Sequence, residues 1–206
     1  MLKVYGRSNS VNVQKVMWII GELGLDHERI DAGGTFGLND QEWYLAMNPM
    51  GRVPVLDDDG YILWESHSII RYLALQNPDA GLYPTDPRLG GDVDKWLDWK
   101  LGFLTPALTP AFWGLIRTPE AEQDKAAIAA SSKASAELFG ILDKHLEGRE
   151  YMAGDNFGLA DMPVGAFTYR WYGLDVEHPD YPNLAAWYER LCQRPAYQEH
   201  VMLPIT

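Results

Sequence analysis

The chain has 206 residues and a formal net charge of −12 at pH 7, and 47% of its residues are hydrophobic, including 8 tryptophans. This length suits one large or two small domains, and the hydrophobic content is sufficient to bury a core, which excludes an intrinsically disordered chain. The acidic balance argues against a nucleic-acid or anionic-membrane partner, because either would require a basic face.

The sequence predicts neither a membrane anchor nor a disulfide framework. No run approaches the roughly 20 apolar residues of a membrane-spanning helix. The N-terminus enters a strand pattern at Leu2 and Val4, so no secretory apolar segment is expected. The single cysteine, Cys192, excludes an intrachain disulfide, and a cytoplasmic location follows as the default expectation.

The first 30 residues predict a β-α-β unit. Residues 2–5 form a strand pattern and residues 6–11 a polar loop, after which Asn12 is placed to cap a helix that runs to Leu23. Residues 27–30 form a second strand pattern. The two strands should be parallel, because a helix connects them.

A predicted hairpin and a further helix follow a Gly-rich loop and a short helical segment. The stretch from Val53 to Trp64 alternates as two strands about an Asp59-Gly60 turn, and an amphipathic helix then runs from Ser66 to about Gln76. A helix that starts directly at a strand end presents unsatisfied main-chain N–H groups to an anion, such as the carboxylate of a small peptide. The order β-α-β-α-β-β-α is that of the thioredoxin-like fold.

The remainder of the chain is predicted to be helical. Three prolines between Asn77 and Arg88 indicate a linker. Helical patterns then cover residues 96–104, 126–146, 161–172 and 184–193, the last of them ending at Pro195. We therefore expect an α/β thioredoxin-like domain over residues 1–77, a linker over 78–88 and an all-helical domain over 89–206.

These motifs together resemble the soluble glutathione transferases. The family's strongest motif, Asn-Pro-x-Gly-x-Val-Pro followed at this distance by Glu-Ser and a helix, is similar to Asn48–Pro54 and Glu65-Ser66. The resemblance continues in Tyr5–Asn12, Phe157–Asp161 and Arg194–Tyr197, so it covers essentially the whole chain. The pattern looks closest to the bacterial, theta-like transferases that carry a serine at the activating position. The family resemblance implies the thioredoxin-like fold, an all-α C-terminal domain and a two-fold homodimer.

A glutathione site in the N-terminal domain follows from this resemblance. Ser66 and the helix N-terminus would bind the γ-glutamyl carboxylate, and Glu65 could pair with the ammonium group. Arg52 could neutralise the glycyl carboxylate. The resemblance implies a cis bond between Val53 and Pro54, which would let the main chain of Val53 pair with the peptide as an added strand. The alternatives are that Ser66 is only a helix cap, Arg52 a solvated residue and Pro54 a trans proline that starts an edge strand.

Ser10 is the first candidate for activating the thiol, Asn12 the second and Tyr5 the third. Lowering a cysteine pKa from about 8.5 by roughly two units requires about 2.7 kcal/mol. A hydrogen bond to a charged acceptor supplies about 1.5–3 kcal/mol, and a helix N-terminus about 0.3–1 kcal/mol. Ser10 would thus donate to the sulfur without acting as a nucleophile, and no metal is needed. Arg7 and Ser8 lie close enough to assist electrostatically, or are solvated loop residues.

The expected reaction is attack by bound glutathione on a small electrophile. Serine in place of cysteine at position 10 favours conjugation over thiol exchange, so we expect a detoxification transferase acting on halides, epoxides or unsaturated carbonyls. Trp113 and Arg117 are candidates for an electrophile pocket between the domains. Arg117 could hold a carboxylate, which suggests haloacid dehalogenation, or it could be an exposed helix-end residue, and Trp113 could belong to the core.

Two other functions stay open at this point. The chain could be a glutathione-dependent disulfide or peroxide reductase that uses two glutathiones and no enzyme cysteine. It could also be a non-catalytic glutathione-binding regulatory module. None of the five histidines forms a metal-ligand spacing or a nucleophile–base pair, so no metal is expected.

Overall fold

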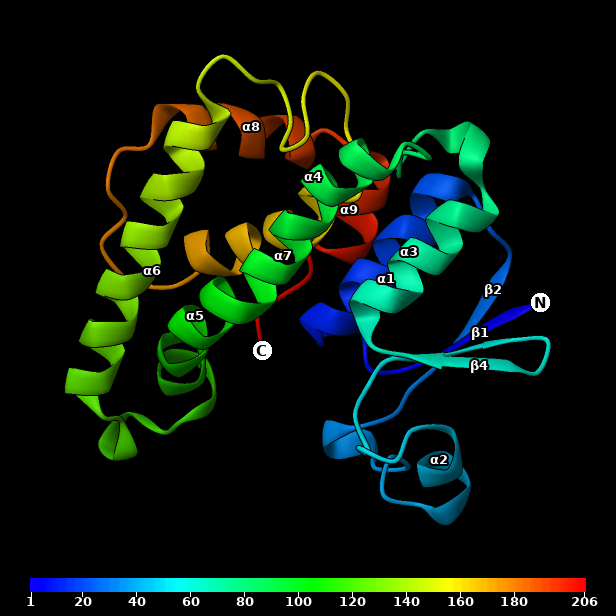
Figure 1. Cartoon of the computed structure of the whole chain (residues 1–206). Helices are drawn as coiled ribbons and strands as arrows, with labels where there is room; N and C mark the ends of the chain where they lie inside the picture. Colours follow the sequence, from blue (N-terminus) through cyan, green and yellow to red (C-terminus); the bar gives the residue numbers. More distant parts are fainter. The chain divides into compact units, whose positions relative to one another are not determined.

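The computed structural model describes residues 1–206, which divide into two units (Figure 1). Residues Met1–Tyr83 and Pro195–Leu203 form the first unit, and residues Pro84–Arg194 and Pro204–Thr206 form the second. A segment close to the C-terminus therefore belongs to the same unit as the N-terminal strands.

A four-stranded mixed sheet forms the centre of the first unit. The strands are β1 (Leu2–Tyr5), β2 (His27–Ile30), β3 (Val55–Asp58) and β4 (Tyr61–Trp64), in the order β2-β1-β3-β4. Strand β2 is parallel to β1, as predicted, and β3 is antiparallel to both β1 and β4. The hairpin turns at Asp59 and Gly60, which have positive φ values of 48° and 95°. A turn with positive φ at both central positions matches the twist of the strands that it joins.

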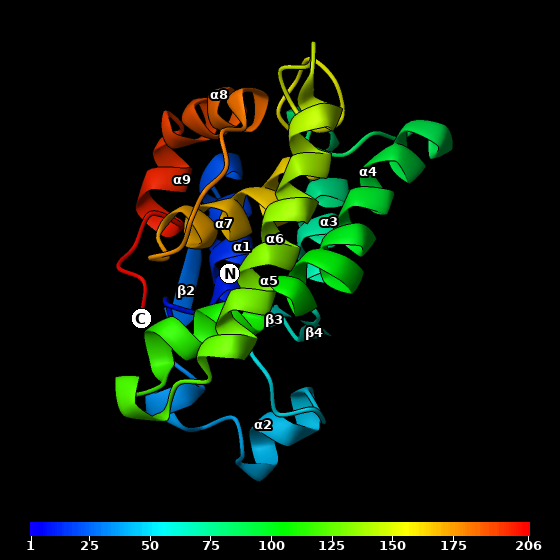
Figure 2. The same cartoon turned by 90° about the vertical axis from the view of Figure 1, so that its left-hand side faces the viewer.

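Helices cover both faces of this sheet. Helices α1 (Val11–Leu23) and α3 (Ser66–Gln76) pack together on one face, and the short α2 (Glu42–Met47) lies on the other side of the sheet (Figures 1 and 2). Tyr44 of α2 is fully buried in a core cluster with Ala32 and Val55. Single-turn 3-10 helices lie at Gly34–Phe36 and Pro78–Ala80. The arrangement is the predicted thioredoxin-like fold.

Helix α1 begins earlier than the sequence predicted. Ser10, not Asn12, is the cap residue, because the N–H of Gln14 already donates to the main-chain oxygen of Ser10 at 2.8 Å. Asn12 lies in the first helical turn, and its side chain is exposed. The correction places Ser10 itself at the helix N-terminus.

The last helix of the chain was not predicted. Helix α8 spans Pro182–Cys192, and a further helix, α9, runs over Pro195–His200. Pro195 therefore starts a helix as well as following one, which its missing N–H allows at a first helical position. Helix α9 packs against α1, where the rings of Trp18 and Tyr197 have centroids 4.6 Å apart.

The regular secondary structure of the second unit is helical, as predicted, apart from an isolated β-bridge between Tyr151 and Gly154. Helix α4 (Pro87–Trp99) continues through a π-helical segment, η3 (Lys100–Leu104), into α5 (Thr105–Phe112) and a second π-helical segment, η4 (Trp113–Arg117). Pro106 and Pro110 supply no N–H to this run, and the widened π turns lie on either side of them. A 3-10 turn follows at Glu120–Glu122, and then α6 (Lys125–Leu146), α7 (Asp161–Tyr172) and α8 complete the unit. None of the helices combines the length and the apolar character that a membrane span requires.

Candidate active site

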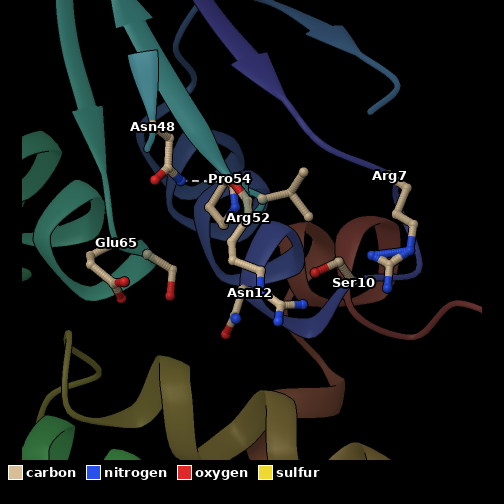
Figure 3. Close-up of a pocket in the computed structure, with 9 residues that line it drawn as sticks. Arg7, Ser10, Asn12, Asn48, Arg52, Pro54 and Glu65 are labelled. Carbon is tan, nitrogen blue, oxygen red and sulfur yellow. Dashed lines mark hydrogen bonds between the residues drawn. The ribbon is translucent and has the colours of Figure 1, made fainter. Parts of the chain in front are cut away.

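A pocket of about 380 Å³ lies in the first unit, at the N-terminal ends of α1 and α3. Its lining comes from the β1–α1 loop, from the segment before β3 and from the start of α3 (Figure 3). The lining residues are Arg7, Ser10, Asn12, Asn48, Arg52, Val53, Pro54, Glu65 and Ser66. The residues that the sequence proposed for binding glutathione line the pocket, together with Ser10, Asn12 and Arg7, whereas Tyr5 does not; Asn48 is added.

The segment that leads into Pro54 is held by a polar network. The hydroxyl of Tyr44 donates to the main-chain oxygen of Arg52 at 2.9 Å, and Nδ2 of Asn48 donates to the same oxygen at 2.8 Å (Figure 3). Oδ1 of Asn48 accepts from the N–H of Met50 at 3.0 Å. Burial raises the pKa of Tyr44 to about 12, so its hydroxyl keeps the proton that it donates. These bonds fix the path of the loop before the cis peptide bond.

Val53 and Pro54 follow this network directly. The bond between them is cis, as the family resemblance implied. Val53 precedes β3, and its main-chain N–H and C=O take no part in the loop and turn hydrogen bonds of the chain. Gly51 has a φ of 58°, and a Cβ atom there would come 2.9 Å from the main-chain oxygen of Asn39, which explains the glycine in the motif. A peptide backbone can therefore pair with Val53 as an extra strand.

The start of α3 leaves main-chain donors at the pocket. Glu65 has the cap position with φ 70° and ψ 110°, and no side chain caps the helix. The first helical bond runs from the N–H of Ile69 to the oxygen of Glu65 at 2.9 Å, so the N–H of Ser66 precedes the helical ladder. A non-glycine residue at positive φ is strained by about 1–3 kcal/mol, and such residues cluster at ligand sites. This helix start is suited to an anion.

Ser10 presents its hydroxyl at the N-terminus of α1. The residue is 8% exposed, and its side chain makes no capping hydrogen bond to the helix that it precedes. In Figure 3 the hydroxyl points toward Arg52 and Asn12, whose side chains are both exposed. A hydroxyl with no internal acceptor at a helix N-terminus can donate to a sulfur atom in the pocket, with the helix dipole favouring negative charge there.

Tyr5 does not line the pocket. Its ring packs against Trp43 and Tyr44, with centroid separations of 5.9 and 6.3 Å. It therefore belongs to an aromatic cluster of the core, and Ser10 and Asn12 remain as the candidates at the thiol position.

Trp113 and Arg117, the candidates for the electrophile site, belong to the second unit. Trp113 is 52% exposed, so it is not a core residue. The guanidinium of Arg117 lies 4.8 Å from the ring centroid of Trp113, and its Nη2 donates to the main-chain oxygen of Thr206 at 3.0 Å. The Arg117 side chain is thus engaged with the C-terminal residue.

Sequence reasoning did not assign the two groups that hold the oxygen of Arg52. Asn48 carried a signal, because it opens the Asn-Pro-x-Gly run of the motif. Tyr44 carried none, since its hydroxyl reaches Arg52 only through the irregular path of the chain between them.

Comparisons with known proteins identify the family of this chain. Two family models match: "Glutathione S-transferase, N-terminal domain" over residues 4–81, and "Glutathione S-transferase, C-terminal domain" over residues 104–195. Glutathione S-transferase GstB of Escherichia coli (strain K12) is 41% identical over 208 residues, with 100% of both chains covered. Glutathione S-transferase F13 of Arabidopsis thaliana is 31% identical, covering 95% of this chain and 93% of that one.

A solved structure is also similar over its whole length. The theta class glutathione S-transferase from the citrus canker pathogen Xanthomonas axonopodis pv. citri, with glutathione bound, has a TM-score of 0.96 and 44% sequence identity to this chain. The match covers 100% of this chain and 99% of that one.

Proposed function

We propose that this chain, which belongs to the glutathione S-transferase family, binds glutathione in the pocket between Ser10 and Ser66 and activates its thiol for attack on small electrophiles. The observation that carries the proposal is that two helix N-termini without side-chain caps, those of α1 and α3, line one pocket with Val53. A ligand that is anionic at two separated positions satisfies both. Glutathione, with a carboxylate at one end and a thiolate in the middle, is such a ligand.

Each part of the tripeptide has a partner in the proposal. Ser66 and the N-terminus of α3 bind the γ-glutamyl carboxylate, and Glu65 pairs with the adjacent ammonium. The main chain of Val53 pairs with the cysteinyl residue as an added strand. Arg52 neutralises the glycyl carboxylate. The glutathione bound in the Xanthomonas relative supports this choice of ligand.

Ser10 activates the thiol by hydrogen bonding. Its hydroxyl donates to the sulfur and stabilises the thiolate, while the thiol proton passes to solvent. The sulfur then attacks the electrophilic carbon. With a halide, the carbon–halogen bond breaks and the halide leaves with the bonding pair; with an epoxide the carbon–oxygen bond breaks, and the resulting alkoxide, or the enolate formed from an unsaturated carbonyl, takes a proton from solvent. Asn12, in the first turn of α1, is the second candidate for this role, because its amide can also donate.

The substrates in this proposal are alkyl and aryl halides, epoxides and unsaturated carbonyls, and the role is detoxification. Trp113 and Arg117 are proposed to contribute to binding the electrophile. Dehalogenation of small haloacids is a specific form of this reaction, in which a cation holds the carboxylate of the substrate.

Parallel assays test the proposal. Purified protein is titrated with reduced glutathione by calorimetry, and turnover is measured with chlorodinitrobenzene, an epoxide, a small disulfide and cumene hydroperoxide. We expect glutathione to bind and conjugation to exceed the uncatalysed rate. Disulfide or peroxide reduction without conjugation would instead identify a reductase, and binding with no turnover would identify a regulatory module. No heat at millimolar glutathione would refute the proposal altogether.

The proposal includes a homodimer and a cytoplasmic location. The proposed contacts lie on α3, at Arg71, Tyr72 and the face of Leu75, and Leu75 is 56% exposed. Analytical ultracentrifugation of the wild type and of Leu75→Lys tests the dimer. The variant should dissociate into monomers at a higher protein concentration than the wild type does. The cytoplasm is the expected compartment because the reaction consumes reduced glutathione, which that compartment maintains.

A further inference from the structure

The main-chain oxygen of Arg52 accepts two hydrogen bonds from the last turn of helix α2. The hydroxyl of Tyr44 donates to it at 2.9 Å, and Nδ2 of Asn48, the residue that ends the helix, donates to it at 2.8 Å. The N–H of Asn48 donates to the main-chain oxygen of Tyr44 at 2.9 Å, so a helical bond fixes one donor relative to the other. A carbonyl oxygen has two lone pairs, and both are therefore occupied.

Tyr44 reaches this oxygen from the core of the first unit. Its side chain is fully buried with Ala32 and Val55, and its ring lies edge-on to the ring of Tyr5, with centroids 6.3 Å apart. The Arg52 oxygen thus satisfies a hydroxyl that would otherwise be buried without a partner. Tyr44 does not line the pocket, so any effect that it has on a bound ligand passes through the main chain of Arg52.

The peptide unit between Arg52 and Val53 carries this restraint toward the pocket. The cis bond of this segment is the next one along the chain, between Val53 and Pro54, so the Arg52–Val53 peptide is trans. In a trans peptide unit, the C=O and the N–H lie in one plane and point in opposite directions. The two donors that hold the oxygen of Arg52 therefore also direct the N–H of Val53 away from α2.

The N–H of Val53 is available to a ligand. It takes no part in the loop and turn hydrogen bonds of the chain, and Val53 lines the pocket. In the proposed function, the main chain of Val53 pairs with the cysteinyl residue of glutathione as an added strand. Two residues paired in this way exchange two hydrogen bonds, so the N–H of Val53 meets the cysteinyl C=O. The orientation of one peptide plane therefore controls the geometry of that bond.

We propose that Tyr44 is a positioning residue for glutathione, which holds the Arg52–Val53 peptide plane so that the N–H of Val53 meets the cysteinyl carbonyl. The inference rests on the proposed function and adds to it a residue that touches neither the ligand nor the pocket. A plane that is fixed before binding does not have to be ordered by the ligand. A plane that is free to tilt raises the Kd in inverse proportion to the fraction of chains with the right orientation.

Tyr44→Phe tests this role, because it removes the hydroxyl and keeps the ring in the core. The Kd for glutathione, measured by calorimetry, should rise by about three- to tenfold, the size of one neutral hydrogen bond. The KM for glutathione in turnover with chlorodinitrobenzene should rise by the same factor, while kcat stays within about twofold, because glutathione that has bound itself holds the plane. A general structural defect would instead lower the fraction of active protein, and kcat with it.

A ligand without the cysteinyl carbonyl isolates the bond to Val53. γ-Glutamylcysteamine has the γ-glutamyl group and the thiol of glutathione, and it offers no acceptor to the N–H of Val53. Its Kd, measured by competition with glutathione, should change by less than about twofold in Tyr44→Phe, because the coupled pair is already broken in the ligand. Equal increases in the two Kd values would show that the variant loosens the whole pocket, and would refute the proposal.

Tyr181→Phe is the matched control for the loss of a hydroxyl. The hydroxyl of Tyr181 donates to the main-chain oxygen of Ala136 at 2.8 Å, in the second unit and outside the pocket. Its removal should lower the free energy of unfolding in urea and leave the Kd for glutathione unchanged. Asn48→Leu removes the other donor to the Arg52 oxygen and should give the same difference between the two ligands, so the test does not depend on the folding of Tyr44→Phe.

The outcomes separate this inference from the proposed function. A wild type that binds and conjugates glutathione, with an unchanged Kd in both Tyr44→Phe and Asn48→Leu, would overturn the role of Tyr44 alone. A fall in kcat at an unchanged KM in Tyr44→Phe would overturn it as well. A wild type that binds no glutathione would overturn the proposed function and this inference with it.

Discussion

The helices that line the pocket begin differently from those of the second unit. Helices α1 and α3 follow Ser10 and Glu65, and no side chain caps either of them. The six-residue helix α2, which lies outside the pocket, also has no side-chain cap. In the second unit Asp86 caps α4 by accepting from two main-chain N–H groups, and Asp124 caps α6 by accepting from one. The Oδ1 atom of Asp143 accepts from two N–H groups at the start of α8. In the second unit, these carboxylates accept hydrogen bonds from the main-chain N–H groups at the helix N-termini. At the pocket, the N–H groups of α1 and α3 have no side-chain acceptor and are available to a ligand.

Asp161 of the second unit accepts hydrogen bonds from both main-chain and side-chain donors. This fully buried carboxylate accepts from the N–H of Met152 at 2.9 Å, from the N–H of Gly158 at 2.9 Å and from Nε1 of Trp187 at 2.8 Å. It thereby joins the start of α7 to the preceding loop and to α8. Buried polar groups that are satisfied in this way support the fold, whereas those left open at the pocket are available for chemistry.

The largest expected effect comes from removing this carboxylate. Asp161→Ala leaves three buried donors without an acceptor, at about 1–3 kcal/mol each, so the free energy of unfolding at pH 7 should fall by at least about 3 kcal/mol. Urea denaturation of the variant measures the loss. Asp175→Ala, which removes an exposed carboxylate of the same unit, should change it by less than about 0.5 kcal/mol. Equal losses of unfolding free energy in the two variants would contradict the structural role assigned to Asp161.

The second effect is a pH dependence of stability caused by Asp161. Burial raises the pKa of this carboxyl from 3.8 to about 6, although its three hydrogen bonds act in the opposite direction. The pKa of Asp161 is higher in the folded chain than in the unfolded chain. The contribution of protonated Asp161 to the free energy of unfolding is therefore complete below pH 4 and is lost as the pH rises through about 6. At about 1.36 kcal/mol for each pKa unit, the loss is about 3 kcal/mol.

Comparison with an isosteric variant isolates this dependence. Asp161→Asn cannot titrate, so the free energy of unfolding of the wild type minus that of the variant should fall between pH 4 and pH 7. Chemical denaturation at a series of pH values measures the difference. A difference that does not vary with pH would show that the carboxyl titrates alike in the folded and unfolded chains.

Replacement of Ser10 should give the opposite result, with a loss of activity and little loss of stability. Ser10→Ala should lower the second-order rate with chlorodinitrobenzene by about tenfold or more, because the hydrogen bond to the thiolate is lost. Its free energy of unfolding should stay within about 0.5 kcal/mol of the wild type, because the side chain makes no cap bond. Ser8→Ala, in the same loop with an exposed side chain, is the control and should be fully active. Full activity in Ser10→Ala would transfer the role to Asn12.

A smaller effect is expected at the start of α3. Ser66→Ala removes one neutral hydroxyl from the proposed carboxylate site and leaves the main-chain N–H groups, so the Kd for glutathione should rise by about five- to tenfold. Isothermal titration calorimetry measures it. Ser68→Ala lies in the same turn outside the pocket and should bind glutathione as the wild type does. An unchanged Kd in Ser66→Ala would locate the γ-glutamyl end elsewhere.

Local signals account for the parts of the fold and pocket that the sequence predicted. The hairpin follows from the Asp59-Gly60 turn between two apolar runs, and the position of α3 follows from the change of period after Glu65. The residues from Arg52 to Ser66 in the proposed glutathione site were found together because they lie in one stretch that resembles a family motif. These signals need no knowledge of distant parts of the chain.

The parts that were not predicted depend on contacts between distant residues. Ser10 and Asn12 are both good cap residues, and the choice between them depends on the β1–α1 loop, where Arg29 donates to the oxygen of Gly6 at 2.8 Å. Whether Pro195 ends or begins a helix depends on the packing of α9 against α1. Sequence pattern alone carries neither fact.

Ultraviolet titration of the thiolate absorbance of protein-bound glutathione tests most directly whether the open helix N-terminus at Ser10 activates a thiol. The account predicts that the bound thiol ionises with a pKa about two units below the ordinary cysteine value of about 8.5, and that Ser10→Ala returns it most of the way. A bound thiol that ionises at its ordinary pH in the wild-type protein would contradict the account.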